Sequence, residues 1–185
     1  EYRKKDELFF SENLKSIYGD FYLLPEGGTN DFAVKGCAEI LTNKDTSFDY
    51  VCSSVGTGGT IAGLIKSSNS LQTILGFSAL KGTFQTSYIN KFTRKKNYRI
   101  LDDYCFGGYA KVNTELIEFM NDFKNKTAVS LDPIYTGKMI FGIFDLINKG
   151  YFKKNSTILA VHTGGLQGIN GMNALLKKKN LPTII

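Results

Sequence analysis

The sequence predicts an α/β fold: a three-layer arrangement in which helices cover both faces of a mostly parallel, twisted sheet. Three segments share one plan, an apolar strand followed by a turn with paired glycines and then a helix. Strands that alternate with helices are typical of parallel sheets buried on both faces. Ligands of such sheets bind beyond the carboxyl ends of the strands, where all three glycine turns are expected to lie.

The first of these units follows an amphipathic segment at about residues 7–18, which we expect to be helical. Phe21–Leu24 is apolar and predicts a strand that leads into Pro25–Gly28. Apolar residues then recur at helical spacing over about residues 31–41.

The second unit is the most informative one. Tyr50–Cys52 predicts a buried strand, Gly56–Thr60 is a glycine-rich turn, and apolar residues recur at helical spacing from Ile61 onward. A further strand is predicted at residues 73–77. Residues 98–108 mix aromatic, acidic and glycine residues, which indicates a loop.

The rest of the chain completes the pattern. Helices are predicted at residues 114–123 and 139–147. The third unit consists of an apolar strand at Ile158–Val161, the turn His162–Gly165 and a helix that ends in Lys177–Lys179. A packing role can explain any one glycine pair, but three pairs at one edge of a sheet favour a binding site.

The Gly56–Thr60 turn is suited to an anion. Glycines let backbone N–H groups approach a ligand closely, and the N-terminus of the following helix adds partial positive charge. The turn is not a dinucleotide fingerprint, because Ile61 stands where the third glycine belongs, and it is not a Walker loop, because no lysine follows Gly63. We therefore expect a phosphate loop of a third kind.

Bulk composition excludes several classes of function. A length of 185 residues indicates one domain, and the formal charge of +6 comes mainly from lysine. The basic residues form short clusters, typical of solvated surface, so a nucleic-acid partner is only the third hypothesis. No apolar run has the length of a membrane span, so we expect no membrane partner, and no signal peptide is visible.

The cysteines and the single histidine limit the chemistry further. Cys37, Cys52 and Cys105 are an odd number without metal-ligand spacing, which favours a reducing cytoplasm. His162 is the only histidine, so neither a metal centre nor a Ser-His-Asp triad is indicated. A structural role for His162 is the favoured interpretation.

Two tyrosines stand in unusual settings. Pro133 and Gly137 frame Tyr135 just before a predicted helix, and Tyr109 follows a glycine pair. Both phenols could transfer protons if their environment lowers the pKa; for Tyr135 an aromatic packing role is an equal alternative. Lys138 adjoins Tyr135 and could form a Schiff base, but on a helix surface a solvated lysine is the commoner outcome.

Five sequence blocks, in this order, closely resemble the C-terminal portion of the 1-aminocyclopropane-1-carboxylate deaminase / D-cysteine desulfhydrase family. These are pyridoxal-phosphate enzymes of the tryptophan-synthase-β-like fold (fold type II), and the resemblance covers nearly the whole chain. Each block alone is weak, whereas five in the correct order are specific. The blocks are Leu24–Asn30, Gly56–Thr60, Gly107–Ala110, Asp132–Lys138 and His162–Gly165.

The resemblance implies a role for each matching position. Tyr135 would lie near pyridoxal 5'-phosphate and the substrate amino group, Tyr109 would be the second active-site tyrosine, and Thr163 would sit beside the pyridine nitrogen. The cofactor phosphate would be bound by Thr57, Gly58, Gly59 and Thr60. It also implies that residues 1–185 are mainly the large, cofactor-binding domain, incomplete here, and that the full-length protein is a cytoplasmic homodimer acting on a small amino acid.

Two departures within the blocks bear on the substrate. Thr136 and Thr163 stand where the deaminases proper carry glutamate and leucine, and both threonines resemble the D-cysteine desulfhydrase branch. That branch eliminates a β-leaving group from a D-amino acid and gives sulfide, ammonia and pyruvate. Opening of a cyclopropane ring is the alternative reaction.

The family's Schiff-base lysine lies in a Gly-Asn-Lys motif, which does not occur in these 185 residues, and neither does the Ser-Asn-His segment that follows it in the family. The sequence also begins without methionine, as a piece of a longer protein would. We therefore expect this chain to be inactive by itself. A non-catalytic phosphate-binding domain is the hypothesis from a different class of function.

Overall fold

The computed structural model describes residues 7–185 of the chain. In this part, four strands form one parallel sheet in the order β3-β2-β1-β4: β1 (Tyr50–Val55), β2 (Thr73–Ser78), β3 (Tyr98–Leu101) and β4 (Ile158–Val161). The α-helices are α1 (Glu7–Tyr18), α2 (Asp31–Cys37), α3 (Gly59–Ser67), α4 (Gln85–Phe92), α5 (Thr114–Thr127), α6 (Thr136–Asn148) and α7 (Gly168–Lys178). Two 3-10 helices span Glu26–Gly28 and Asn43–Asp45.

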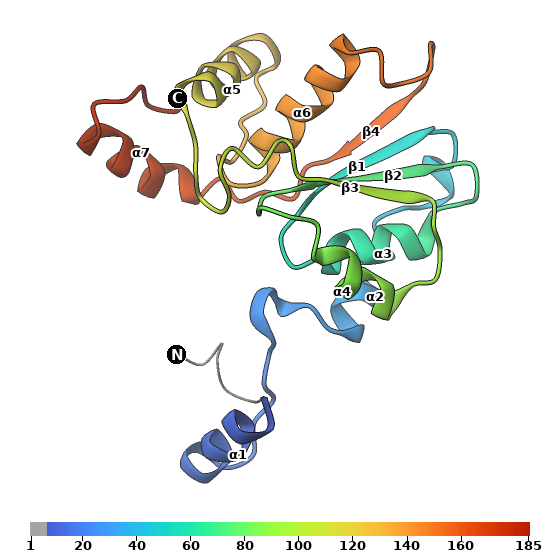
Figure 1. The fold of residues 1–185 in the computed structure, drawn as a ribbon, viewed down its shortest axis with the longest axis vertical. Coiled ribbons are helices and arrows are strands. Elements are labelled where there is room, and N and C mark those ends of the chain that lie inside the picture. Colours follow the sequence, from blue (N-terminus) through green and yellow to red (C-terminus); the bar gives the residue numbers. More distant parts are fainter. Residues whose placement is uncertain (1–6) are drawn as a thin grey trace.

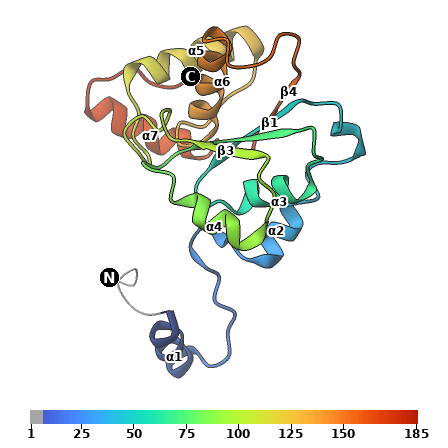
Figure 2. The same cartoon turned by 45° about the vertical axis from the view of Figure 1, so that its right-hand side comes forward.

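The sheet is the middle layer of three. Helices α2, α3 and α4 lie on one face, and α5 and α6 lie on the other, in both views (Figures 1 and 2). Helix α7 packs with the second group, since its Met172 and Leu176 belong to the same apolar cluster as α5 and α6. The predicted α/β class with a parallel sheet and helices on both faces is confirmed.

The side chains of the central strands point alternately to the two faces of the sheet and contribute to an apolar core on each face. Val51 of β1 is opposite Ile74 of β2, and both pack against the apolar side of α3. Their neighbours Cys52 and Leu75 point to the opposite face and pack against α5 and α6. All four side chains are completely buried. Successive residues of a strand face opposite sides, so a continuous apolar run is what a doubly covered strand requires.

The predicted strand at Phe21–Leu24 is wrong. This segment is extended but pairs with no strand among the described residues. Its apolar side chains are largely exposed, with Tyr22 at 65% and Leu24 at 67%. A strand needs a neighbour for its backbone groups, and apolar content alone does not supply one.

The predicted loop at 98–108 is wrong over its first four residues, because Tyr98–Leu101 pairs with β2 as an edge strand. Helix α4 was not predicted at all, and α2 ends at Cys37, earlier than the sequence suggested. The expected elements at 7–18, 50–52, 73–77, 114–123, 139–147 and 158–161 all fall inside observed helices or strands of the right type.

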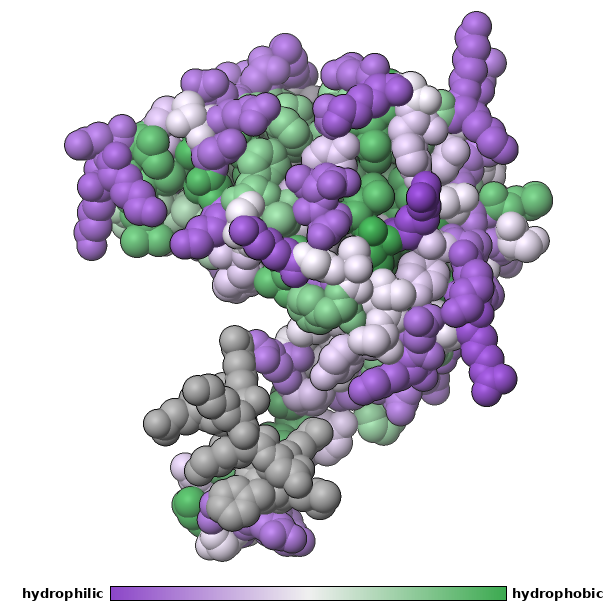
Figure 3. All heavy atoms as spheres, in the orientation of Figure 1, coloured by the Kyte–Doolittle hydropathy of each residue, from purple (hydrophilic) through white to green (hydrophobic). Residues whose placement is uncertain are grey.

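Helix α1 stands apart from the sheet in both ribbon views, joined by the extended residues that precede α2 (Figures 1 and 2). In the described part of the chain, no helix combines the length and apolar character needed to cross a bilayer. Hydrophilic side chains are spread over the visible face of the molecule (Figure 3). This even distribution of hydrophilic side chains agrees with the interpretation of the short basic clusters as solvated surface.

Candidate functional site

A cavity of about 1070 Å³ opens at the carboxyl-terminal edge of the sheet. All three glycine turns contribute to its wall, although the first reaches it from an irregular segment and not from a strand. Every residue to which the family resemblance gives a site role lines this one cavity: Thr57, Gly58, Gly59, Thr60, Tyr109, Tyr135 and Thr163.

The floor of the cavity is the turn between β1 and α3. Gly58 is the N-cap of α3 and has φ +102°, a conformation that L side chains rarely adopt. The first helical hydrogen bond runs from the N–H of Ala62 to the oxygen of Gly58 (3.0 Å). The N–H groups before Ala62 therefore have no partner within the helix and are available to an anion.

A second turn is pressed against this floor. The hydroxyls of Thr29 and Thr57 are 2.6 Å apart and share a hydrogen bond. A Cβ on Gly27 would come within 2.6 Å of the Thr57 side chain, and one on Gly59 within 2.9 Å of the Thr29 hydroxyl. Glycine is therefore required at both positions for the two turns to approach this closely.

Tyr135 is held by a buried carboxylate. Asp132 is 2% exposed, and its Oδ1 accepts hydrogen bonds from the N–H groups of Ile134 and Tyr135, both at 2.9 Å. Its Oδ2 accepts from the N–H and the hydroxyl of Thr136, both at 2.7 Å. The Thr136 hydroxyl in turn accepts from the N–H of Asp132 at 2.8 Å. This closed network fixes the turn that begins α6 and points Tyr135 at the cavity.

The Tyr135 phenol crosses the cavity toward the floor, since a Cβ on Gly56 would lie 3.4 Å from its hydroxyl oxygen. The Tyr109 ring is 6.2 Å from the Tyr135 ring, centroid to centroid, at an interplanar angle of 63°. The pKa of Tyr135 is raised to about 12, mainly by burial and to a smaller extent by the nearby Tyr109 phenol. The lowered pKa that a basic role would need is not found, so Tyr135 is suited to donating a proton or hydrogen bond.

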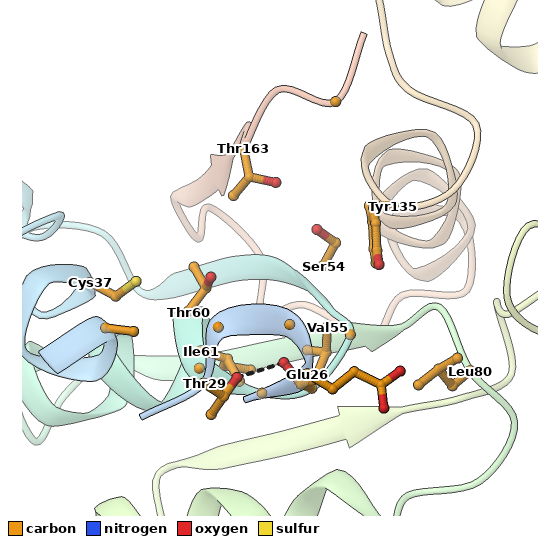
Figure 4. A pocket seen from close by; sticks show the side chains of 18 of the residues that line it. Glu26, Thr29, Cys37, Ser54, Val55, Thr60, Ile61, Leu80, Tyr135 and Thr163 are labelled. Atoms are coloured by element: carbon orange, nitrogen blue, oxygen red, sulfur yellow. Dashed lines mark hydrogen bonds between the residues drawn. The ribbon is translucent and has the colours of Figure 1, made fainter. Parts of the chain in front are cut away.

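Thr163 lies opposite the floor, on the turn that follows β4. Figure 4 shows Thr163 and Tyr135 across the cavity from Thr60, with Ser54 between them. The turn is shaped by His162, whose Nδ1 accepts from the N–H of Gly164 (3.1 Å). Its Nε2 is 2.9 Å from the oxygen of Ser130 and must carry the proton to donate there. His162 thus has a structural contact on each ring nitrogen and does not line the cavity.

The chain is similar to curated proteins over most of its length. It is 30% identical over 184 residues to a Pyrococcus horikoshii protein whose name assigns it provisionally as a 1-aminocyclopropane-1-carboxylate deaminase; the match covers 85% of this chain and 53% of that protein. It is 27% identical over 185 residues to the 1-aminocyclopropane-1-carboxylate deaminase of a Bradyrhizobium strain (86% and 55% covered). No protein-family model matches the chain.

A solved structure described as an ACC deaminase homologue superposes on this fold with a TM-score of 0.75 at 27% identity, covering 93% of this chain and 61% of that one. The chain is therefore similar in sequence and fold to 1-aminocyclopropane-1-carboxylate deaminases and their homologues. Threonine deaminase isoform 2 from Solanum lycopersicum has a TM-score of 0.54 at 17% identity, a likeness of fold alone. The chain spans about half the length of the curated relatives it matches.

Several cavity residues of the chain were not found from the sequence. Ser54 is the penultimate residue of β1, Lys81 and Phe84 lie between β2 and α4, and Gln167 precedes α7. All four stand at or just after the carboxyl ends of strands, so the rule that located the glycine turns could have found them. Lys81 is the one lysine among the described residues that line the cavity.

The expected solvated environment of Lys138 is wrong. The side chain is 1% exposed and does not line the cavity. Thr136 is also absent from the cavity wall and is completely buried, with its hydroxyl engaged by Asp132. No group of three or more metal-ligating side chains occurs in the part of the chain that the structure describes.

Proposed function

We propose that this chain forms the cofactor-binding part, the C-terminal portion, of a pyridoxal-phosphate-dependent lyase or deaminase. The observation that carries the proposal is the shared cavity. An anion-binding helix N-terminus, two tyrosines and Thr163 surround one space in a chain similar to 1-aminocyclopropane-1-carboxylate deaminases. A cavity of about 1070 Å³ is slightly larger than the range for small-molecule sites, ~300–1,000 Å³.

The residues present fit the phosphate and the ring of the cofactor. The N–H groups that precede Ala62, together with the hydroxyls of Thr57 and Thr60, supply the donors that a phosphate requires. The Thr163 hydroxyl, across the cavity, can hydrogen-bond a neutral pyridine nitrogen. When bound, pyridoxal phosphate supplies an electron sink for the carbanion formed at the substrate α-carbon.

The tyrosines supply protons in this proposal. With its pKa raised to about 12, Tyr135 is a neutral phenol at physiological pH, so its Oη can donate toward a substrate carboxylate or leaving group. Tyr109, 55% exposed at the mouth of the same cavity, can exchange protons with solvent. The pair therefore connects the interior of the site with bulk water.

For the substrate we propose a small amino acid and favour β-elimination of the D-cysteine type. The support is the threonine at both branch positions, Thr136 and Thr163. Deamination of 1-aminocyclopropane-1-carboxylate is the second candidate, favoured by the names of the relatives. A substrate panel on the full-length protein separates them: D-cysteine turnover supports the first, and turnover of the cyclopropane compound alone refutes it.

This chain by itself is proposed to be inactive, because the family's Gly-Asn-Lys motif does not occur in its 185 residues. Incubation with pyridoxal phosphate, borohydride reduction and peptide mapping should give no stoichiometric lysine adduct. Lys81 is the residue to watch, since it lines the cavity, and Lys81→Met is the matched control. A stoichiometric adduct at Lys81 that disappears in this variant would contradict the proposal.

Cofactor binding is tested by titrating the chain with pyridoxal phosphate and competing with inorganic phosphate. Thr60→Val should weaken binding about tenfold, the value of one hydrogen bond to a charged group at ~1.5 kcal/mol. Thr46→Val, at an exposed hydroxyl outside the cavity, is the control. Phosphate binding without any preference for the pyridoxal compound would favour the non-catalytic phosphate-binding domain instead.

Two broader features are proposals as well. The full-length protein is proposed to be a homodimer, which light scattering at several concentrations would test. A cytoplasmic location is supported by three free cysteines, two of them buried, and localisation of a tagged full-length protein would test it.

A further inference from the structure

Lys138 is one of the largest completely buried side chains of the described residues. It lies in the first turn of α6, three residues after Tyr135. Its Nζ donates hydrogen bonds to the backbone oxygens of Cys105 and Gly108, both at 2.8 Å. A buried ammonium group is costly, so its retention needs a reason.

The segment that Lys138 binds has an unfavourable backbone. Phe106, Gly107, Gly108 and Ala110 all have positive φ, at 52°, 93°, 120° and 54°. Two of these residues are not glycine, and left-handed conformations of such residues persist only where surrounding contacts enforce them. Tyr109 sits inside this run, so its direction depends on those contacts.

The amine supplies the contacts that close the loop. Within the loop, the N–H of Gly108 donates to the oxygen of Cys105 (3.0 Å), and the N–H of Lys111 donates to the oxygen of Gly108 (3.2 Å). The Lys138 Nζ also donates hydrogen bonds to these two oxygens, those of Cys105 and Gly108, and so bridges them. One ammonium group thus ties both ends of the turn to α6, the helix that Tyr135 precedes.

The buried charge has no ion-pair partner among the described residues, whose ion pairs all involve other lysines. Burial lowers the pKa of Lys138 to about 8, while Cys105 and Asp132 oppose this shift. Lys138 does not line the cavity, and its Nζ is engaged by two backbone oxygens, so the arrangement favours a structural role over a Schiff base.

We propose that Lys138 is a positioning residue that holds the 105–111 loop so that Tyr109 lies against Tyr135 at the cavity mouth. The loop geometry is independent of what the cavity binds, whereas the consequence for a ligand rests on the proposed function. On this inference, α6 aligns both tyrosines: Tyr135 directly at its N-terminus and Tyr109 through the amine of Lys138.

The first test needs no cofactor. In Lys138→Met, which keeps the stem and removes the donors, amide hydrogen exchange at Gly108 and Lys111 should accelerate at least tenfold, and the ring–ring nuclear Overhauser contact between Tyr109 and Tyr135 should disappear. Exchange at Ile74 in the central sheet should stay unchanged. Lys153→Met, the same substitution at an exposed lysine, is the control.

Lys138→Gln keeps two N–H donors on a side chain one bond shorter, so it should show intermediate exchange and decides the question if Lys138→Met does not fold. Unchanged loop exchange and an intact ring contact would overturn the inference. Equal acceleration at Ile74 would also overturn it, because that indicates general destabilisation and not loop positioning.

The second test uses pyridoxal phosphate and inorganic phosphate as probes. Lys138→Met should weaken pyridoxal-phosphate binding several-fold and leave the affinity for inorganic phosphate unchanged, because the proposed phosphate donors lie on the Gly56–Thr60 turn and not on this loop. If the loop loosens but both affinities stay the same, the positioning inference stands and the placement of Tyr109 in the proposed function fails. If the wild-type chain binds neither probe, only the proposed function fails, and the exchange data decide the inference.

Discussion

Removal of the Thr136 hydroxyl tests how the site is built. Thr136 is completely buried, and its hydroxyl both accepts from the N–H of Asp132 (2.8 Å) and donates to Oδ2 of the same residue (2.7 Å). Thr136→Val keeps the shape of the side chain and removes both bonds. The loss of a bond to a charged group, ~1.5–3 kcal/mol, adds to ~1–3 kcal/mol for a buried N–H left without a partner.

The expected total is a decrease of ~3–5 kcal/mol in the free energy of unfolding, because the two effects are coupled and do not add fully. For a chain of this length this corresponds to a fall in Tm of ~2–4 °C per kcal/mol. Urea unfolding followed by circular dichroism measures it, with the m-value checked for constancy.

Thr136→Ser is the matched control, because it keeps both hydrogen bonds and loses one methyl group, at ~1 kcal/mol. The comparison isolates the hydroxyl from the packing. If the valine variant is as stable as the serine variant, the Asp132–Thr136 network does not hold the turn that presents Tyr135.

Three further predictions concern single groups. Gly58→Ala should lower the free energy of unfolding by ~1–2 kcal/mol because of the positive φ alone. The loss should be larger if the new Cβ cannot move away from Ile89 Cγ1, which would lie 3.2 Å from it. Thermal unfolding measures the change, and a neutral effect would contradict the prediction. Burial lowers the pKa of Lys138 to about 8 from the ordinary lysine value near 10.5, so between these values the unfolded chain binds more protons. The stability of wild type relative to Lys138→Met should therefore rise with pH from 8 to 10.5, other titrating groups cancelling in the difference; a falling difference would show that the sign is wrong. Asn113 caps α5 by accepting from the N–H of Leu116 (3.0 Å), so Asn113→Ala should cost ~1 kcal/mol in urea unfolding and leave phosphate affinity unchanged.

Much of the fold could be predicted from local sequence patterns. The central strands were recognisable because β1 and β2 are covered on both faces, so that consecutive residues such as Val51 and Cys52 are both apolar. The edge strand β3 was missed because its four residues, Tyr98–Leu101, are only partly buried and include an exposed arginine. The exposed Phe21–Leu24 segment was taken for a strand because apolar composition does not reveal whether a pairing partner exists.

The candidate site divides in the same way. The three glycine turns could be located from the sequence, because turn chemistry and the strand-end rule act over a few residues. The roles of the seven predicted site residues came from the family resemblance, and all seven line the cavity. Three properties became visible only in the folded chain: Lys138 is buried, the Thr136 hydroxyl hydrogen-bonds Asp132, and the pKa of Tyr135 is raised. These properties depend on atoms brought together from distant parts of the chain, and neither burial nor a hydrogen-bond partner at that range is encoded in local spacing.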